Sequence, residues 1–96
     1  MYLVITTYVV PMQAVEVQRA EHVEWVAKYV KNGTFIIAGP RRGQYGGVIV
    51  ARTMDKVELD RILSEDSFVR EGVVEVNVVD FDPMFAADDF REITNR

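Results

Sequence analysis

The chain has 96 residues, with 11 Lys and Arg against 15 Asp and Glu, a formal net charge of −4 and no cysteine. The length suits a single domain with an ordinary hydrophobic core, and the missing thiols exclude disulfides, thiolate metal sites and cysteine nucleophiles. The negative charge disfavours nonspecific binding to nucleic acid or anionic lipid, so we expect neither partner, and nothing in the composition indicates an oxidising compartment, so we expect a cytoplasmic protein.

The first predicted element is a strand over residues 2–10, which are rich in Val, Ile, Thr and Tyr and end before Pro11. The segment lacks a basic start and a small-residue cleavage site. We therefore interpret it as a strand of the fold and not as a signal peptide or a membrane span.

A helix of about five turns is predicted for residues 12–31, because one stripe of residues recurs at steps of three and four. Asn32-Gly33 supplies the expected end of this helix, since glycine adopts the left-handed conformation without strain. The stripe consists of Val15, Arg19, His22, Val26 and Val30, widened by Val23, Trp25 and Ala27.

Two short apolar strands, residues 34–38 and 48–52, form the next predicted pair. They are bounded by Gly39-Pro40 and Gly46-Gly47, and a basic, glycine-rich loop, residues 41–45, joins them. The order of the two strands and the short loop predict antiparallel pairing.

The remaining predicted elements are a helix, a helical turn, a strand and a tail. The helix starts at Asp55, three residues before Glu58, which is the spacing of a capping box. A helical turn over residues 67–71 leads to the last strand, residues 73–81, and the tail, residues 84–96, is helical or extended.

The order of elements is β-α-β-β-α-β, the ferredoxin-like α+β arrangement with a four-stranded antiparallel sheet. We expect one domain over residues 1–96, with a core of about residues 1–83. Two helices cover only one face of such a sheet, yet the first and third strands are apolar on both faces. Leaving that second face in water would cost many kcal/mol at about 25 cal/mol per Å², so we expect a homodimer through the sheet face.

His22 is the single histidine of the chain and a candidate for proton transfer near neutral pH. It can equally be a half-buried helix histidine bonded to a backbone carbonyl. Asp66 stands directly before a short helix, where aspartate is a preferred N-cap for the amides of Phe68 or Val69. Capping and orienting an imidazole are compatible, because one carboxylate has enough lone pairs for both.

Five motifs, taken in their order along the chain, resemble the YCII-related (YciI-like) family. The resemblance covers roughly residues 1–83, and its specificity lies in the joint order, since each motif alone is short. The motifs are Met1-Tyr2-Leu3-Val4, His22, Ala38-Gly39-Pro40, Gly46-Gly47-Val48-Ile49-Val50 and Asp66-Ser67-Phe68-Val69-Arg70-Glu71-Gly72-Val73.

The resemblance implies the dimeric α+β barrel fold, in which two ferredoxin-like sheets pack face to face. It also implies an active site made of a helix histidine and an aspartate that opens an Asp-Pro-Phe segment, which correspond here to His22 and Asp66. Ser67 stands where the family usually has proline. Because proline is favoured at the first helical position, we expect the serine to loosen this turn modestly.

Arg41 and Arg42 are candidate substrate-binding residues, because guanidinium groups clamp carboxylates and phenolates. The alternative is that they are solvated, as exposed turn arginines usually are. Ser67 offers a hydroxyl, and Phe68, next to the implied dyad, is a candidate pocket wall. One histidine without cysteines predicts no metal site.

Relatives of this barrel, among them a dehydrochlorinase and muconolactone isomerases, move protons on small cyclic oxygenated molecules. The resemblance therefore implies a cofactor-independent enzyme, of lyase or isomerase type, in which His22 and Asp66 act on a small-molecule ligand. The alternative is a non-catalytic small-molecule-binding or accessory dimeric module of the same fold. An oxygenase of the related antibiotic-biosynthesis monooxygenase group shares the fold but lacks residue-level support.

Overall fold

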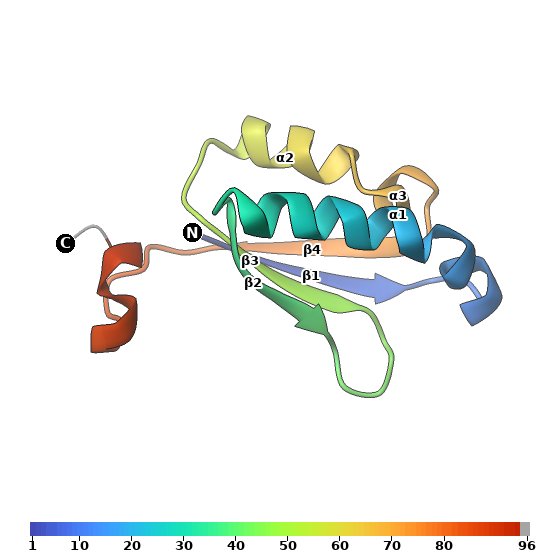
Figure 1. Ribbon diagram of the computed structural model, residues 1–96, viewed down its shortest axis with the longest axis horizontal. Helices are drawn as coiled ribbons and strands as arrows, with labels where there is room; N and C mark the ends of the chain where they lie inside the picture. Colours follow the sequence, from blue (N-terminus) through green and yellow to red (C-terminus); the bar gives the residue numbers. More distant parts are fainter. Residues whose placement is uncertain (95–96) are drawn as a thin grey trace.

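The computed structural model describes residues 1–94 and contains a four-stranded antiparallel sheet with helices packed on one face (Figure 1). The strand order in the sheet is β2-β3-β1-β4, which is the predicted ferredoxin-like α+β fold. In chain order the elements are β1 (Tyr2–Tyr8), α1 (Met12–Lys31), β2 (Phe35–Pro40), β3 (Gly47–Ala51), α2 (Lys56–Ser64), α3 (Ser67–Arg70), β4 (Val74–Asp80) and a 3-10 helix, η1 (Asp88–Ile93).

Helix α1 has the predicted bounds, and its ends follow from the residues beside them. Pro11 precedes the helix in an extended conformation, with φ −59° and ψ 151°. After the helix, Gly33 adopts φ +84°, and its amide donates to the Val30 carbonyl at 3.1 Å. The left-handed glycine turns the chain back toward β2.

The main core lies between α1, α2 and the helix-covered face of the sheet. Tyr2 and Val4 of β1 and Ile49 of β3 are buried there beneath the rings of α1. The Trp25 indole donates a hydrogen bond to the Ile62 carbonyl at 3.0 Å. This bond ties α1 to α2 and satisfies the one polar atom that the indole brings into the core.

The buried side of α1 agrees with the predicted stripe only in part. Its buried residues are Val15, Trp25 and Tyr29, of which the first two belong to the stripe, whereas Arg19 and His22 are only partly buried. The two large rings take the positions that face the core. The predicted stripe is therefore turned to one side of the buried face, and most of it borders a cavity described below.

A second, smaller core cluster seats α3 against the first half of α1. It contains Val15, Phe68, Val73 and Val74, and the Tyr8 ring meets the Phe68 ring edge to face, with centroids 5.8 Å apart. This cluster fixes the position of the residues at the start of α3.

The helix α2 begins after Asp55, but the predicted capping box does not form. The Asp55 side chain makes no capping hydrogen bond, and the Glu58 carboxylate instead binds Arg61 Nη2 at 2.6 Å. The start of α3 behaves as predicted, because Asp66 Oδ1 accepts a hydrogen bond from the Phe68 amide at 3.0 Å.

The face of the sheet opposite the helices, called here the open face, is apolar. Residues paired across strands share a face, and Leu3 pairs with Val50 while Ile5 pairs with Val48. On the outer strand β2, Ile37 is 64% exposed. The apolar residues of the open face are Leu3, Ile5, Ile37, Val48, Val50 and Val79. The homodimer expected to cover this face stays a prediction.

Beyond β4 the chain leaves the sheet and ends in a segment that extends away from the domain (Figure 1). This tail contains η1, and its Phe85 side chain is 92% exposed. The predicted tail is thus extended first and helical later, and its residues 95 and 96 lie outside the described residues.

Candidate active site

His22 and Asp66 are joined by a hydrogen bond between α1 and the start of α3. His22 Nδ1 lies 2.7 Å from Asp66 Oδ1. The aspartate is 1% exposed, and the same oxygen accepts the Phe68 amide. One buried carboxylate therefore both caps α3 and binds the imidazole. Its position at the start of α3 directs the carboxylate toward α1.

The His22 ring is also held from one face by Phe68. The two rings are stacked, with centroids 3.9 Å apart and planes 8° from parallel. The stack and the hydrogen bond to Asp66 together restrict both torsions of the histidine side chain. His22 therefore presents its ring in one orientation.

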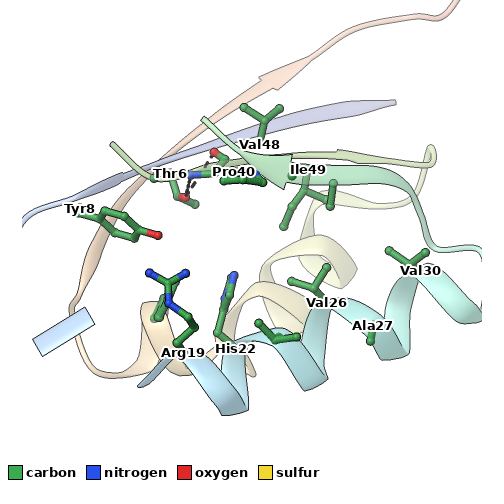
Figure 2. A pocket seen from close by; sticks show the side chains of 16 residues that line it. Thr6, Tyr8, Arg19, His22, Val26, Ala27, Val30, Pro40, Val48 and Ile49 are labelled. Atoms are coloured by element: carbon green, nitrogen blue, oxygen red, sulfur yellow. Dashed lines mark hydrogen bonds between the residues drawn. The ribbon is translucent and has the colours of Figure 1, made fainter. Parts of the chain in front are cut away.

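The second nitrogen of His22, Nε2, is the free polar atom of this pair. An ionised carboxylate only accepts hydrogen bonds, so a bond to Asp66 places the ring hydrogen on Nδ1 and leaves a lone pair on Nε2. Within residues 1–94, every buried side-chain nitrogen or oxygen has a hydrogen-bond partner. Nε2 has none, so it is accessible, and Figure 2 shows the His22 ring pointing into a cavity.

The cavity has a volume of about 360 Å³ and lies between α1 and the ends of β2 and β3. Figure 2 shows Tyr8, Arg19 and His22 together at one end and Val26, Ala27, Val30 and Ile49 at the other. The full lining is Thr6, Tyr8, Arg19, His22, Val23, Val26, Ala27, Val30, Ala38, Gly39, Pro40, Gly46, Gly47, Val48, Ile49 and Phe68. This size and mixture of surfaces suit a small organic ligand.

The rim of the cavity depends on a close approach between the β2–β3 loop and β1. Gly46 has φ +147°, and a Cβ placed on it would lie 2.0 Å from the Thr6 carbonyl oxygen. The Gly47 amide donates to Thr6 Oγ1 at 2.9 Å, so that hydroxyl is engaged by the loop. Gly46 thus allows a backbone contact that a larger residue would prevent.

Arg19 is a cavity residue that the sequence did not single out as a ligand-binding group. It lies one helical turn before His22 and lines the cavity beside Tyr8. The hydrogen bond with Glu16 raises the pKa of the Arg19 guanidinium, and Tyr8 adds to this, although burial opposes it. The sequence signal that could have identified Arg19 as a cavity residue is its position in the largely apolar stripe of the predicted helix, where a cation is unusual.

The two predicted substrate-binding arginines lie outside the cavity lining. Arg41 Nη1 donates to Thr7 Oγ1 at 2.8 Å and to the Thr6 carbonyl at 3.3 Å. It therefore fastens the β2–β3 loop to β1. Arg42 is exposed on the same loop.

Of the other two predicted ligand contacts, the structure brings one to the cavity. Phe68 lines the cavity beneath His22. Ser67 is fully buried, and its hydroxyl donates to the Gln18 carbonyl at 2.9 Å. The serine thus adds a second link between α3 and α1 at the position next to Asp66.

Residues 1–94 contain no group of three or more His, Cys, Asp or Glu side chains arranged to hold a metal ion. In the same part of the chain, no helix has the length and apolar character needed to span a membrane.

The sequence matches the family model of the YCII-related domain over residues 1–82. The chain belongs to the YCII-related domain family. The resemblance inferred from the five motifs is thereby confirmed. No curated protein matches the chain.

Among solved structures, this YCII-related domain is similar to 5-chloro-2-hydroxyhydroquinone dehydrochlorinase from Burkholderia phenoliruptrix AC1100, in its complex with 2,5-dihydroxybenzoquinone. The TM-score is 0.70, and the match covers 84% of this chain and 93% of that chain at 16% sequence identity. At this identity the likeness establishes the fold, and the function has to be argued from the site.

Proposed function

We propose that this YCII-related domain is a cofactor-independent enzyme that transfers a proton on a small, cyclic, oxygenated molecule. His22 is the proposed acid–base residue, and Asp66 orients it. The observation that carries the proposal is the 2.7 Å bond between His22 Nδ1 and buried Asp66, with Nε2 left free toward a cavity of ligand size. The dehydrochlorinase with a similar fold acts on a ring of this class.

In the proposed reaction, His22 Nε2 takes a proton from a ring carbon next to an oxygen-bearing carbon. Asp66 stabilises the imidazolium that forms, because it accepts the hydrogen on Nδ1. The elimination needs a saturated ring carbon, which the diketo tautomer supplies when the substrate is a hydroquinone: the electron pair of the broken C–H bond forms a C=C bond while chloride on the neighbouring carbon departs with its own pair. In an isomerisation, His22 returns the proton to another ring carbon. Neither route needs an oxidant or a reductant.

The test is turnover of 5-chloro-2-hydroxyhydroquinone, followed by chloride release, together with a panel of hydroxylated rings and unsaturated lactones. We expect His22→Asn and Asp66→Asn to lower kcat by about 10²- to 10⁴-fold, the usual contribution of a positioned acid–base group. Asparagine at 66 preserves the cap, so the fold remains intact. Tyr29→Phe, which removes a hydroxyl from α1 outside the cavity, is the matched control.

Two outcomes would decide against catalysis. If His22→Asn turns over a substrate as fast as the unmodified protein, His22 is not the acid–base residue. If the cavity binds ring compounds but converts none of the panel, the domain is the non-catalytic binding module.

We also propose that two copies pack through their open faces, which would remove the apolar face from water. The substitution Ile37→Asp places a charge on the open face, where Ile37 is already exposed in one copy. We expect light scattering coupled to size exclusion to report a dimer for the unmodified protein and a monomer for Ile37→Asp. A monomeric unmodified protein contradicts this proposal.

A further inference from the structure

The cavity has two ends of opposite character, and this division restricts its ligand. The polar end carries the free His22 Nε2, the Arg19 guanidinium and the Tyr8 side chain, while Val26, Val30 and Ile49 form the other end (Figure 2). A ligand that fills both ends therefore has one polar edge and one apolar edge.

The charge at the polar end has one sign. The cavity lining contains no aspartate or glutamate, and Arg19 is its one permanently charged residue. This is notable in a chain whose formal net charge is −4. A ligand oxygen at this end meets a cation without a competing carboxylate in the wall.

Arg19 has partners of its own, Glu16 and Met12 outside the lining and Tyr8 within it, and they leave part of the guanidinium able to bind a ligand. Its Nε and Nη2 contact the Glu16 carboxylate at 3.0 Å and 2.8 Å. Both side chains are substantially exposed, at 39% for Arg19 and 55% for Glu16, so the pair is weak and solvent-screened. Glu16 and Met12 occupy the Nε and Nη2 side of the guanidinium, so the donors left for a second anion are those of Nη1.

We propose that the cavity binds a ring anion, with its anionic oxygen, a carboxylate or a phenolate, on Arg19 and its uncharged edge among Val26, Val30 and Ile49. Arg19, and not Arg41 or Arg42, is then the group that selects charged ligands. The inference rests on the proposed function in one respect: the ring held in this way lies beside His22.

The apolar end adds selectivity of its own. A second charge on the far edge of the ring would lie against aliphatic side chains without a polar partner in the lining, which is unfavourable. An uncharged edge there removes apolar surface from water on both sides. The cavity thus favours rings with one charge over rings with charges at both ends.

The test is binding, which requires no turnover. Three probes separate the contributions: 4-methylbenzoate has one charged and one apolar edge, 4-methylbenzamide is its neutral analogue, and terephthalate carries a charge at each end. Affinities are measured by NMR titration of the backbone amides. We expect 4-methylbenzoate to bind about 10-fold or more tightly than either of the other probes.

The variant Arg19→Gln should weaken 4-methylbenzoate binding by about 10- to 100-fold and leave 4-methylbenzamide unchanged, since only a charge-assisted bond is lost. Arg19→Lys should retain part of the affinity. Arg42→Gln removes the same charge from an exposed position outside the cavity lining and is the matched control, expected to change affinity less than about 2-fold.

Equal binding of the benzoate and the benzamide, an equal loss in Arg42→Gln, or no binding of the benzoate would each overturn the inference. A domain that binds the benzoate through Arg19 but converts no ring substrate would refute the proposed catalysis and leave the anion site standing.

Discussion

Glu65 and Asp66 are consecutive carboxylates that make the same kind of hydrogen bond to rings on α1. Glu65 Oε1 accepts the Tyr29 hydroxyl at 2.6 Å, and Asp66 Oδ1 lies 2.7 Å from His22 Nδ1. The two contacts connect the same two segments, so they are a natural pair for comparison.

What surrounds the two carboxylates differs. Glu65 is 32% exposed and is shared with Lys28 and Arg61, whose nitrogens lie 3.7 Å and 3.0 Å away. The Asp66 carboxylate is buried and has no lysine or arginine side chain as a partner within residues 1–94. A tyrosine has only one polar atom, which Glu65 uses, whereas the histidine keeps a second for the cavity. The two hydrogen bonds are alike, and the second ring nitrogen, free toward the cavity, is what makes His22 and not Tyr29 the proposed acid–base residue.

The largest expected difference between the two carboxylates is in stability. Asp66→Ala removes the cap of α3 and leaves the Phe68 amide and His22 Nδ1 without their buried acceptor, so we expect a loss of about 2 to 4 kcal/mol in the free energy of unfolding. Glu65→Ala should cost about 1 kcal/mol or less, because its partners are near solvent. Urea denaturation measures both, and equal losses would contradict the comparison.

Removal of the ring hydroxyl gives an intermediate effect. Tyr29→Phe deletes one hydrogen bond and leaves Glu65 with Lys28, Arg61 and water, so we expect a loss of about 1 kcal/mol. Binding of 4-methylbenzoate should be unchanged, because Tyr29 lies outside the cavity lining. A large loss of ligand affinity in this variant would mean that the two contacts are coupled.

The smallest expected effect is a pH dependence specific to Glu65. The Tyr29 hydroxyl, with help from Lys28 and Arg61, holds the pKa of Glu65 below its ordinary value of 4.5. The folded state therefore binds fewer protons at Glu65 than the unfolded state, so its stabilisation is complete above pH 4.5 and is lost as the pH falls further. Between about pH 5 and about pH 3, the unmodified protein should lose more stability than Glu65→Gln. The same loss in both would show that Glu65 does not contribute.

The fold was largely predictable because its elements are strongly patterned. The bounds of α1 agree with the structure, since Pro11 and Gly33 mark them chemically. The strands shift by one or two residues, as in β1, which ends at Tyr8 and not at residue 10. Strand ends depend on pairing with neighbouring strands, which a single segment does not encode.

Site residues that belong to a sequence motif were predictable, whereas residues whose place in the cavity depends on the orientation of a helix were not. The segment around Asp66 identified the partner of His22 through the family resemblance. Arg41 and Arg42 were proposed because guanidinium groups clamp carboxylates and phenolates, whereas Arg19 was placed in the helix stripe without a ligand role. Only the rotation of α1, set by the burial of Trp25 and Tyr29, shows that Arg19 borders the cavity.

The contacts of Glu65 and Asp66 have a mechanical consequence. Neighbouring residues have Cα atoms about 3.8 Å apart, whereas His22 and Tyr29 are separated by about 10 Å along the axis of α1. The side chains of His22 and Tyr29 therefore reach from two positions along α1 to the same short segment, Glu65 and Asp66. These two contacts hold α1 against rotation about its own axis and against translation along it. We infer that the aim of Arg19, Val26 and Val30 into the cavity is preset before any ligand arrives.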